Sequence, residues 1–193
     1  DGSSDVCSSD LWAARLAERT RALKVGNGLD EGVQIGPMID VAAVAKVEAH
    51  LADAVAGGAT VLAGGRRHAL GGAFFEPTVV AGVTREMTIA REETFGPLMP
   101  LVRFQTDAEA IEMANDSEFG LASYLFSRDA ARVWRTAEAL ASGMVGINTG
   151  LISTEVAPFG GVKQSGLGRE GSHYGIDEYL EIKYLCWDGL GAA

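Results

Sequence analysis

The chain has 193 residues, 47% of them hydrophobic and 22% charged, and a net charge of −10 at pH 7. This composition is typical of a globular protein with a sizeable core. The acidic balance argues against nucleic-acid binding, which requires a basic face, and against docking on an anionic membrane surface. No apolar run approaches the roughly 20 residues of a membrane-spanning helix. Two cysteines are too few for a disulfide framework and favour a reducing, cytoplasmic setting.

Residues 1–11 differ from the rest of the chain. They contain a near-repeat of Ser-Ser-Asp and show no hydrophobic periodicity. They also lack the basic start and the apolar centre of a secretory signal. We interpret residues 1–11 as a tail foreign to the fold, which we expect to begin near Trp12.

The hydrophobic periodicity then alternates between that of helices and that of strands. The predicted helices are 12–24, 41–56, 106–115 and 129–140, and the predicted strands are 60–63, 74–80, 98–104, 121–126 and 144–148. Asp40 and Thr106 are suitable helix N-caps, and Pro77 favours an edge position for its strand. The alternation predicts an α/β layer with a largely parallel sheet, whose ligand site lies in loops after the strands. We therefore expect the irregular residues 149–168 to be functional.

Residues 179–187 alternate between two faces. One face carries Tyr179, Glu181, Lys183 and Leu185, and the other carries Leu180, Ile182, Tyr184 and Cys186. This period of two predicts a strand. We expect Cys186 to be a small packed side chain in it. An exposed, regular strand can also pair with another chain.

Two motifs contain the candidate chemistry. Residues 91–97, Arg-Glu-Glu-Thr-Phe-Gly-Pro, combine two carboxylates, one aromatic ring and a turn. A carboxylate can accept two hydrogen bonds from a diol, and a ring face offers apolar contact to a flat heterocycle. The alternative is a solvated acidic turn with one phenylalanine in the core. Residues 157–166, Ala-Pro-Phe-Gly-Gly-Val-Lys-Gln-Ser-Gly, form a glycine-rich loop in which the backbone can turn sharply.

Together these motifs resemble the aldehyde dehydrogenase superfamily, and the resemblance extends from about residue 12 to residue 190. It matches the C-terminal part of that family. It therefore implies an α/β fold, with the C-terminal part of the parallel-sheet catalytic domain over residues 12–165. Residues 166–193 would be a connector and an oligomerisation strand. The catalytic cysteine and general-base glutamate of the family lie upstream, so we expect no catalytic residue in this chain.

The resemblance also implies roles for four residues. Glu93 would bind the hydroxyls of the nicotinamide ribose, and Phe95 would pack against the nicotinamide ring. The choice of Glu93 over Glu92 rests on the resemblance alone. Phe159 would line the substrate tunnel, although it could equally anchor its own loop. Ser153, in a stretch similar to the succinate-semialdehyde dehydrogenase branch, would help to hold a distal carboxylate, although loop serines more often cap their own backbone.

Cys7 and the histidines are not expected to be functional. Cys7 lies in a segment without family resemblance, so we reject it as the nucleophile. His50, His68 and His173 are scattered in the sequence and predict no metal site.

The resemblance implies an NAD(P)-dependent enzyme that oxidises succinate semialdehyde to succinate, with NAD or NADP as cofactor. We expect a homo-oligomer formed through residues 179–187, and no turnover by this chain alone. Two alternatives stay open. One is an aldehyde dehydrogenase that acts on another aldehyde. The other is a non-catalytic assembly module that pairs through residues 179–187.

Overall fold

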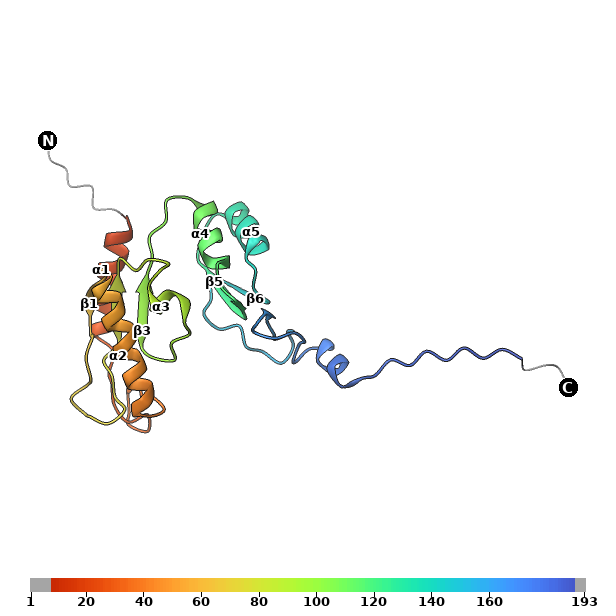
Figure 1. The fold of residues 1–193 in the computed structure, drawn as a ribbon, viewed down its shortest axis with the longest axis horizontal. Coiled ribbons are helices and arrows are strands. Elements are labelled where there is room, and N and C mark those ends of the chain that lie inside the picture. The colour runs from red at the N-terminus through yellow and green to blue at the C-terminus, as the bar shows by residue number, and fades with distance from the viewer. Residues whose placement is uncertain (1–7, 190–193) are drawn as a thin grey trace. The chain divides into compact units, whose positions relative to one another are not determined.

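The computed structural model describes residues 8–189, which divide into two compact units, one ending at Phe104 and the other beginning at Gln105. The unit ending at Phe104 contains α1 (Ser8–Arg21), α2 (Val41–Ala56), β1 (Thr60–Ala63), β2 (Thr78–Ala81), α3 (Thr88–Arg91) and β3 (Leu98–Leu101), of which all but β2 are labelled in Figure 1. The other contains α4 (Asp107–Asn115), β4 (Phe119–Gly120), β5 (Ala122–Leu125), α5 (Ala130–Ala139), β6 (Met144–Ile147), β7 (Val162–Lys163) and the 3-10 helix η1 (Tyr174–Tyr179). The boundary at 104/105 differs from the one expected near residue 165.

α1 begins inside the segment predicted to be foreign. Its first residue is Ser8, so residues 8–11 are helical. Residues 1–7 of the predicted tail, including Cys7, lie outside the described residues. The fold therefore starts earlier than the hydrophobic periodicity indicates.

The sheet of the first unit is mixed, with the strand order β1-β2-β3. β2 pairs antiparallel with β1 and parallel with β3. β2 is therefore the central strand, and the edge position predicted from Pro77 is wrong. Pro77 lies one residue before β2, where its missing N–H removes no bond from the ladder.

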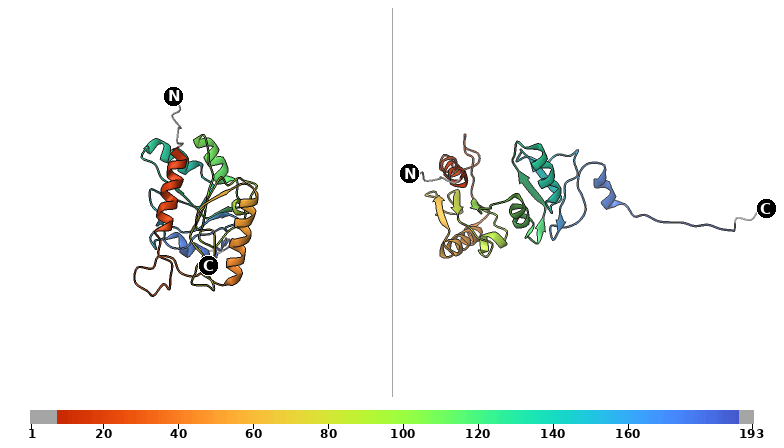
Figure 2. Two further views of the ribbon diagram at one scale, coloured as in Figure 1. Left: turned by 90° about the vertical axis from the view of Figure 1, so that its left-hand side faces the viewer. Right: turned by 90° about the horizontal axis from the view of Figure 1, so that it is seen from above.

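Two helices cover opposite faces of this sheet, as Figure 2 shows. Successive residues of a strand point to opposite faces. Val80 accordingly belongs to a core cluster with α2, and Val79 belongs to a cluster with Ala17 of α1. The α2 cluster combines Val44, Val47, Leu51 and Ala54 with Ala59, Phe75, Val80, Val83, Met87 and Ile89.

Helix caps that were predicted from local sequence are confirmed. The Asp40 side chain accepts a hydrogen bond from the Ala43 N–H at 2.7 Å, which begins α2. Thr106 Oγ1 accepts from the Glu109 N–H at 3.1 Å, which begins α4. Glu109 Oε2 in turn accepts from the Gln105 N–H at 2.6 Å, so the side chains at both ends of this turn stabilise it.

The unit that begins at Gln105 has two small sheets, each with two strands. β5 and β6 are parallel, and β4 and β7 are antiparallel. The expected largely parallel sheet is therefore corrected to mixed pairing in both units. Between residues 105 and 189 the buried residues are three glycines, Gly120, Gly146 and Gly161. Both buried apolar clusters of the described residues lie in the unit ending at Phe104.

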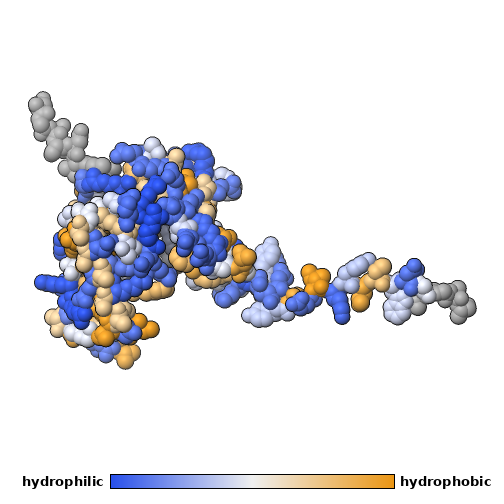
Figure 3. All heavy atoms as spheres, in the orientation of Figure 1, coloured by the Kyte–Doolittle hydropathy of each residue, from blue (hydrophilic) through white to orange (hydrophobic). Residues whose placement is uncertain are grey.

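The strand predicted at residues 179–187 is wrong for this chain. η1 ends at Tyr179, and the residues from 180 to 189 have no regular structure and are all exposed. Figure 3 shows apolar and polar side chains side by side along this segment. Cys186 is exposed and not packed. A strand requires a backbone partner, and no described residue forms a ladder with this segment.

Candidate functional site

The 92–97 loop is the irregular segment that joins α3 to β3, and both of its ends are fixed. The Glu92 N–H donates to the Thr88 carbonyl at 2.9 Å, which continues the last turn of α3. At the other end, the Pro97 carbonyl accepts from the Thr78 N–H of β2 at 2.8 Å. The sheet and the helix thus position the loop between them.

Phe95 lies in this loop with 80% of its surface exposed. The alternative that Phe95 is a core ring is therefore wrong. A phenyl ring exposed to this extent offers a free face to a flat partner molecule. The neighbouring Glu93 is exposed as well.

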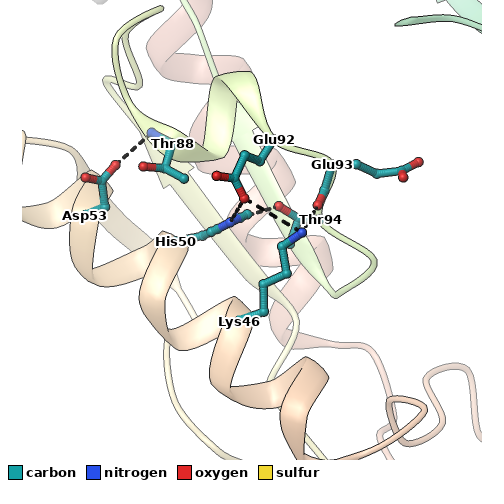
Figure 4. Close-up of polar contacts among 7 residues, drawn as sticks. All are labelled: Lys46, His50, Asp53, Thr88, Glu92, Glu93 and Thr94. Atoms are coloured by element: carbon teal, nitrogen blue, oxygen red, sulfur yellow. Dashed lines mark hydrogen bonds and ion pairs between the residues drawn. The ribbon is translucent and has the colours of Figure 1, made fainter. Parts of the chain in front are cut away.

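The two adjacent carboxylates face different surroundings, as Figure 4 shows. Glu92 Oε2 lies 3.3 Å from His50 Nε2 and 3.8 Å from Lys46 Nζ, so its carboxylate is turned toward α2. Glu93 instead offers its backbone carbonyl to Lys46 Nζ at 2.8 Å, and its carboxylate points away from α2. Both side chains are exposed, but the Glu92 carboxylate is paired with α2, whereas the Glu93 carboxylate is directed away from it.

Asp53, one turn further along α2, caps the short helix before the loop. Its Oδ2 accepts a hydrogen bond from the Thr88 N–H at 2.7 Å. This backbone hydrogen bond lowers the pKa of the Asp53 carboxyl below its usual value, because it stabilises the charged form. The first turn of α3 is thereby held to α2.

The two predicted substrate-binding residues, Ser153 and Phe159, lie in the unit that begins at Gln105. Phe159 is half-buried, and its backbone pairs with that of Glu170 through N–H···O bonds of 2.8 and 2.7 Å. The backbone of Phe159 thus anchors its loop, and the residue as a whole is partly exposed. Ser153 is exposed in the segment after β6. Within the described residues its hydroxyl makes no hydrogen bond, so it does not cap its own backbone.

The Phe159 loop is held by close backbone contacts. Arg169 Nη1 donates to the carbonyls of Gly161 and Gly168 at 2.8 and 2.7 Å. Gly143 lies so close that an added β-carbon would stand 2.9 Å from the Gly160 carbonyl carbon and from the Gly161 Cα. Glycine at position 143 is therefore required by the approach of two backbone segments.

Sequence reasoning missed Lys46, His50 and Thr94, which contact the 92–97 loop from α2 or within it. His50 was considered only as a metal ligand. Among residues 8–189 no group of three histidine, cysteine or carboxylate side chains is placed to hold a metal ion. The four-residue spacing of Lys46 and His50 indicates a shared helix face, but the loop that they contact lies more than 40 residues away in the sequence.

Comparison with known proteins identifies the family. The profile of the aldehyde dehydrogenase family matches residues 7–185. The chain belongs to the aldehyde dehydrogenase family. It is 61% identical over 181 residues to a glutarate-semialdehyde dehydrogenase of Pseudomonas aeruginosa. The matched region covers 94% of this chain and 38% of that relative. The chain is 58% identical over 177 residues to an NADP(+) succinate-semialdehyde dehydrogenase of Escherichia coli, with coverages of 92% and 37%.

A solved structure shows the same fold. The crystal structure of succinate-semialdehyde dehydrogenase from Burkholderia pseudomallei superimposes with a TM-score of 0.89 at 65% identity, over 92% of this chain and 37% of that one. This chain therefore has the aldehyde dehydrogenase fold, which is α/β with mixed sheets. The chain spans little more than a third of the length of these relatives. In the part of the chain that the structure describes, no helix is long and apolar enough to cross a membrane.

Proposed function

We propose that the whole protein to which this chain belongs is an NAD(P)-dependent aldehyde dehydrogenase that oxidises succinate semialdehyde to succinate. The observation that carries the proposal is the exposed Phe95 ring beside the accessible Glu93 carboxylate on a loop with fixed ends. The carboxylate suits a ribose diol, and the ring suits a nicotinamide face. When bound, the nicotinamide accepts the hydride that leaves the aldehyde carbon, and water supplies the oxygen of the acid.

The substrate part of the proposal rests on Ser153 and Phe159. The relatives named above act on glutarate semialdehyde and succinate semialdehyde, two aldehydes with a carboxylate at the far end. The exposed Ser153 hydroxyl can donate one hydrogen bond to such a carboxylate. A single donor supports a cationic clamp and does not replace it. Glutarate semialdehyde is the second candidate, because it differs by one methylene.

We place the chain in the C-terminal part of the enzyme, because residues 91–97 and 157–166 resemble motifs of that part of the family. The nucleophilic cysteine and the general base would then lie in the preceding part. The sequence of the source gene on both sides of this segment tests the placement. Most of the missing length is expected upstream of Trp12, and an extension mainly downstream of residue 193 would overturn it.

The function is tested with the whole protein made from its source gene. We expect NAD(P)H to form with succinate semialdehyde, and the 193-residue chain alone to form none. In the whole protein, Glu93→Gln is expected to raise the KM for the cofactor roughly 10- to 150-fold, because it removes a charged hydrogen-bond acceptor. Turnover by the chain alone would contradict the proposal that the nucleophile lies outside it. An unchanged cofactor KM in Glu93→Gln would contradict the proposal that Glu93 binds the cofactor.

Glu48→Gln is the matched control for this substitution. Glu48 lies on α2 and pairs with Arg67 through two contacts of 2.7 Å at the surface. Arg67 lowers the pKa of the Glu48 carboxyl through this hydrogen bond. The control removes the same charge without contact to the 92–97 loop, so the cofactor KM should stay within about twofold, because exposed ion pairs contribute little.

The partner of residues 179–187 is proposed to be a second copy of the protein. The segment is extended, exposed and alternating, which suits pairing with the edge of a sheet in a neighbouring subunit. Deletion of residues 180–189 from the whole protein is expected to produce smaller species in size-exclusion chromatography. An unchanged elution volume would contradict this role. A defined oligomer of the chain without NAD(P) binding would instead favour the non-catalytic assembly module.

A further inference from the structure

The middle of the 92–97 loop is held by two polar side chains of α2, shown in Figure 4. Lys46 Nζ donates to the Glu93 backbone carbonyl at 2.8 Å. His50 Nδ1 lies 2.6 Å from Thr94 Oγ1. These contacts hold the carbonyl of the Glu93–Thr94 peptide and the Thr94 side chain to α2, while the Glu93 residue stays exposed.

An apolar contact adds to this attachment. Val47 of α2 is 1% exposed, and a β-carbon at Gly96 would overlap its side chain. The same β-carbon would lie 3.2 Å from Met38 Cε. The backbone at Gly96 therefore packs directly on α2, next to the exposed Phe95.

His50 is a buried residue whose polar atoms depend on their partners in the 92–97 loop. The residue is 3% exposed, and both ring nitrogens have partners. The Glu92 carboxylate accepts hydrogen bonds only, so Nε2 donates to it. In the neutral ring Nδ1 then accepts from the Thr94 hydroxyl. A buried imidazole that lost either partner would bear the cost of an unsatisfied polar atom.

We infer that His50 and Thr94 are positioning residues for the nicotinamide cofactor, an inference that rests on the proposed function. Neither residue needs to touch the cofactor. Their contact holds the 92–97 loop in one conformation, so that the Glu93 carboxylate and the Phe95 ring are already oriented when the cofactor arrives. Without the contact, cofactor binding has to order the loop, which weakens affinity.

The test compares Thr94→Val with Thr94→Ser in the whole protein. Valine keeps the shape of threonine and removes the hydroxyl, whereas serine keeps the hydroxyl. We expect Thr94→Val to raise the KM for the cofactor about three- to tenfold, as expected for one lost hydrogen bond, with the aldehyde KM unchanged within about twofold. Thr94→Ser should leave the KM for the cofactor at the value of the parent protein. Equal effects of the two substitutions, or an equal rise in the aldehyde KM, would overturn the inference.

The same comparison is made from the helix side. His50→Asn keeps an amide near the position of Nδ1, and His50→Leu removes every polar atom. We expect His50→Leu to raise the cofactor KM as Thr94→Val does, and His50→Asn to recover most of the loss. The control is again Glu48→Gln, on the same helix but away from the loop.

A measurement independent of turnover separates this inference from the proposed function. In hydrogen exchange of the whole protein without cofactor, the amides of residues 93–96 are expected to exchange at least about threefold faster in Thr94→Val than in the parent, in line with one lost hydrogen bond. Unchanged exchange overturns the inference, even if the enzyme is active. A parent that forms no NAD(P)H with any aldehyde overturns the proposed function, while the exchange rates still decide whether α2 holds the loop.

Discussion

Gly143→Ala is expected to destabilise the unit that begins at Gln105 by about 3 kcal/mol, at the upper end of overpacking costs. The added methyl group would meet the backbone of Gly160 and Gly161, which cannot move aside as the end of a flexible side chain can. The Phe159 loop would have to separate from Gly143. Urea unfolding followed by circular dichroism measures the loss.

Gly150→Ala is the matched control, because no heavy atom lies within 4 Å of a β-carbon at that position. Both substitutions reduce the entropy of the unfolded chain equally, so their difference isolates the contact with residues 160 and 161. Equal urea midpoints for the two variants would contradict the close approach of the two segments.

Phe75→Ala is expected to cost about 3–5 kcal/mol of the free energy of unfolding, as for other buried phenylalanines. Phe75 is 1% exposed and packs in the cluster that joins α2 to β2. Its removal leaves a cavity beneath the helix that holds the 92–97 loop. Chemical denaturation of the chain measures the change.

Phe95→Ala makes the same chemical change at a ring that is 80% exposed. Its cost in stability should stay below about 0.5 kcal/mol, since few packing contacts are lost. In the whole protein, however, Phe95→Ala should weaken cofactor binding, whereas Phe75→Ala should act mainly through stability. A Phe95→Ala variant as unstable as Phe75→Ala would show that the ring is part of the core.

Local features of this protein are readable from its sequence. The caps at Asp40 and Thr106 were predicted correctly, because a cap depends on residues three or four positions apart. Residues 60–63 and 144–147 were also placed correctly as strands, because short apolar runs between turn residues are likewise a local pattern. The family was also recognised from two short motifs, and the profile match confirms it.

Features that depend on distant partners were missed or wrong. Pro77 indicated an edge strand, but the neighbours of β2 come from segments on both sides of it in the sequence. Residues 179–187 have the period of a strand, yet a strand forms only where another backbone accepts its hydrogen bonds. His50 was set aside, because nothing local shows that it meets Thr94 of a loop 44 residues away.

The uneven distribution of buried apolar side chains has a consequence for synthesis of the protein. Both buried clusters of the described residues belong to the unit ending at Phe104, and this unit leaves the ribosome before the unit that begins at Gln105. It can therefore condense around α2 while the remainder is still being translated, since domains generally fold as units during synthesis. The unit that begins at Gln105, whose buried residues between 105 and 189 are glycines, relies more on backbone contacts and is completed later in synthesis.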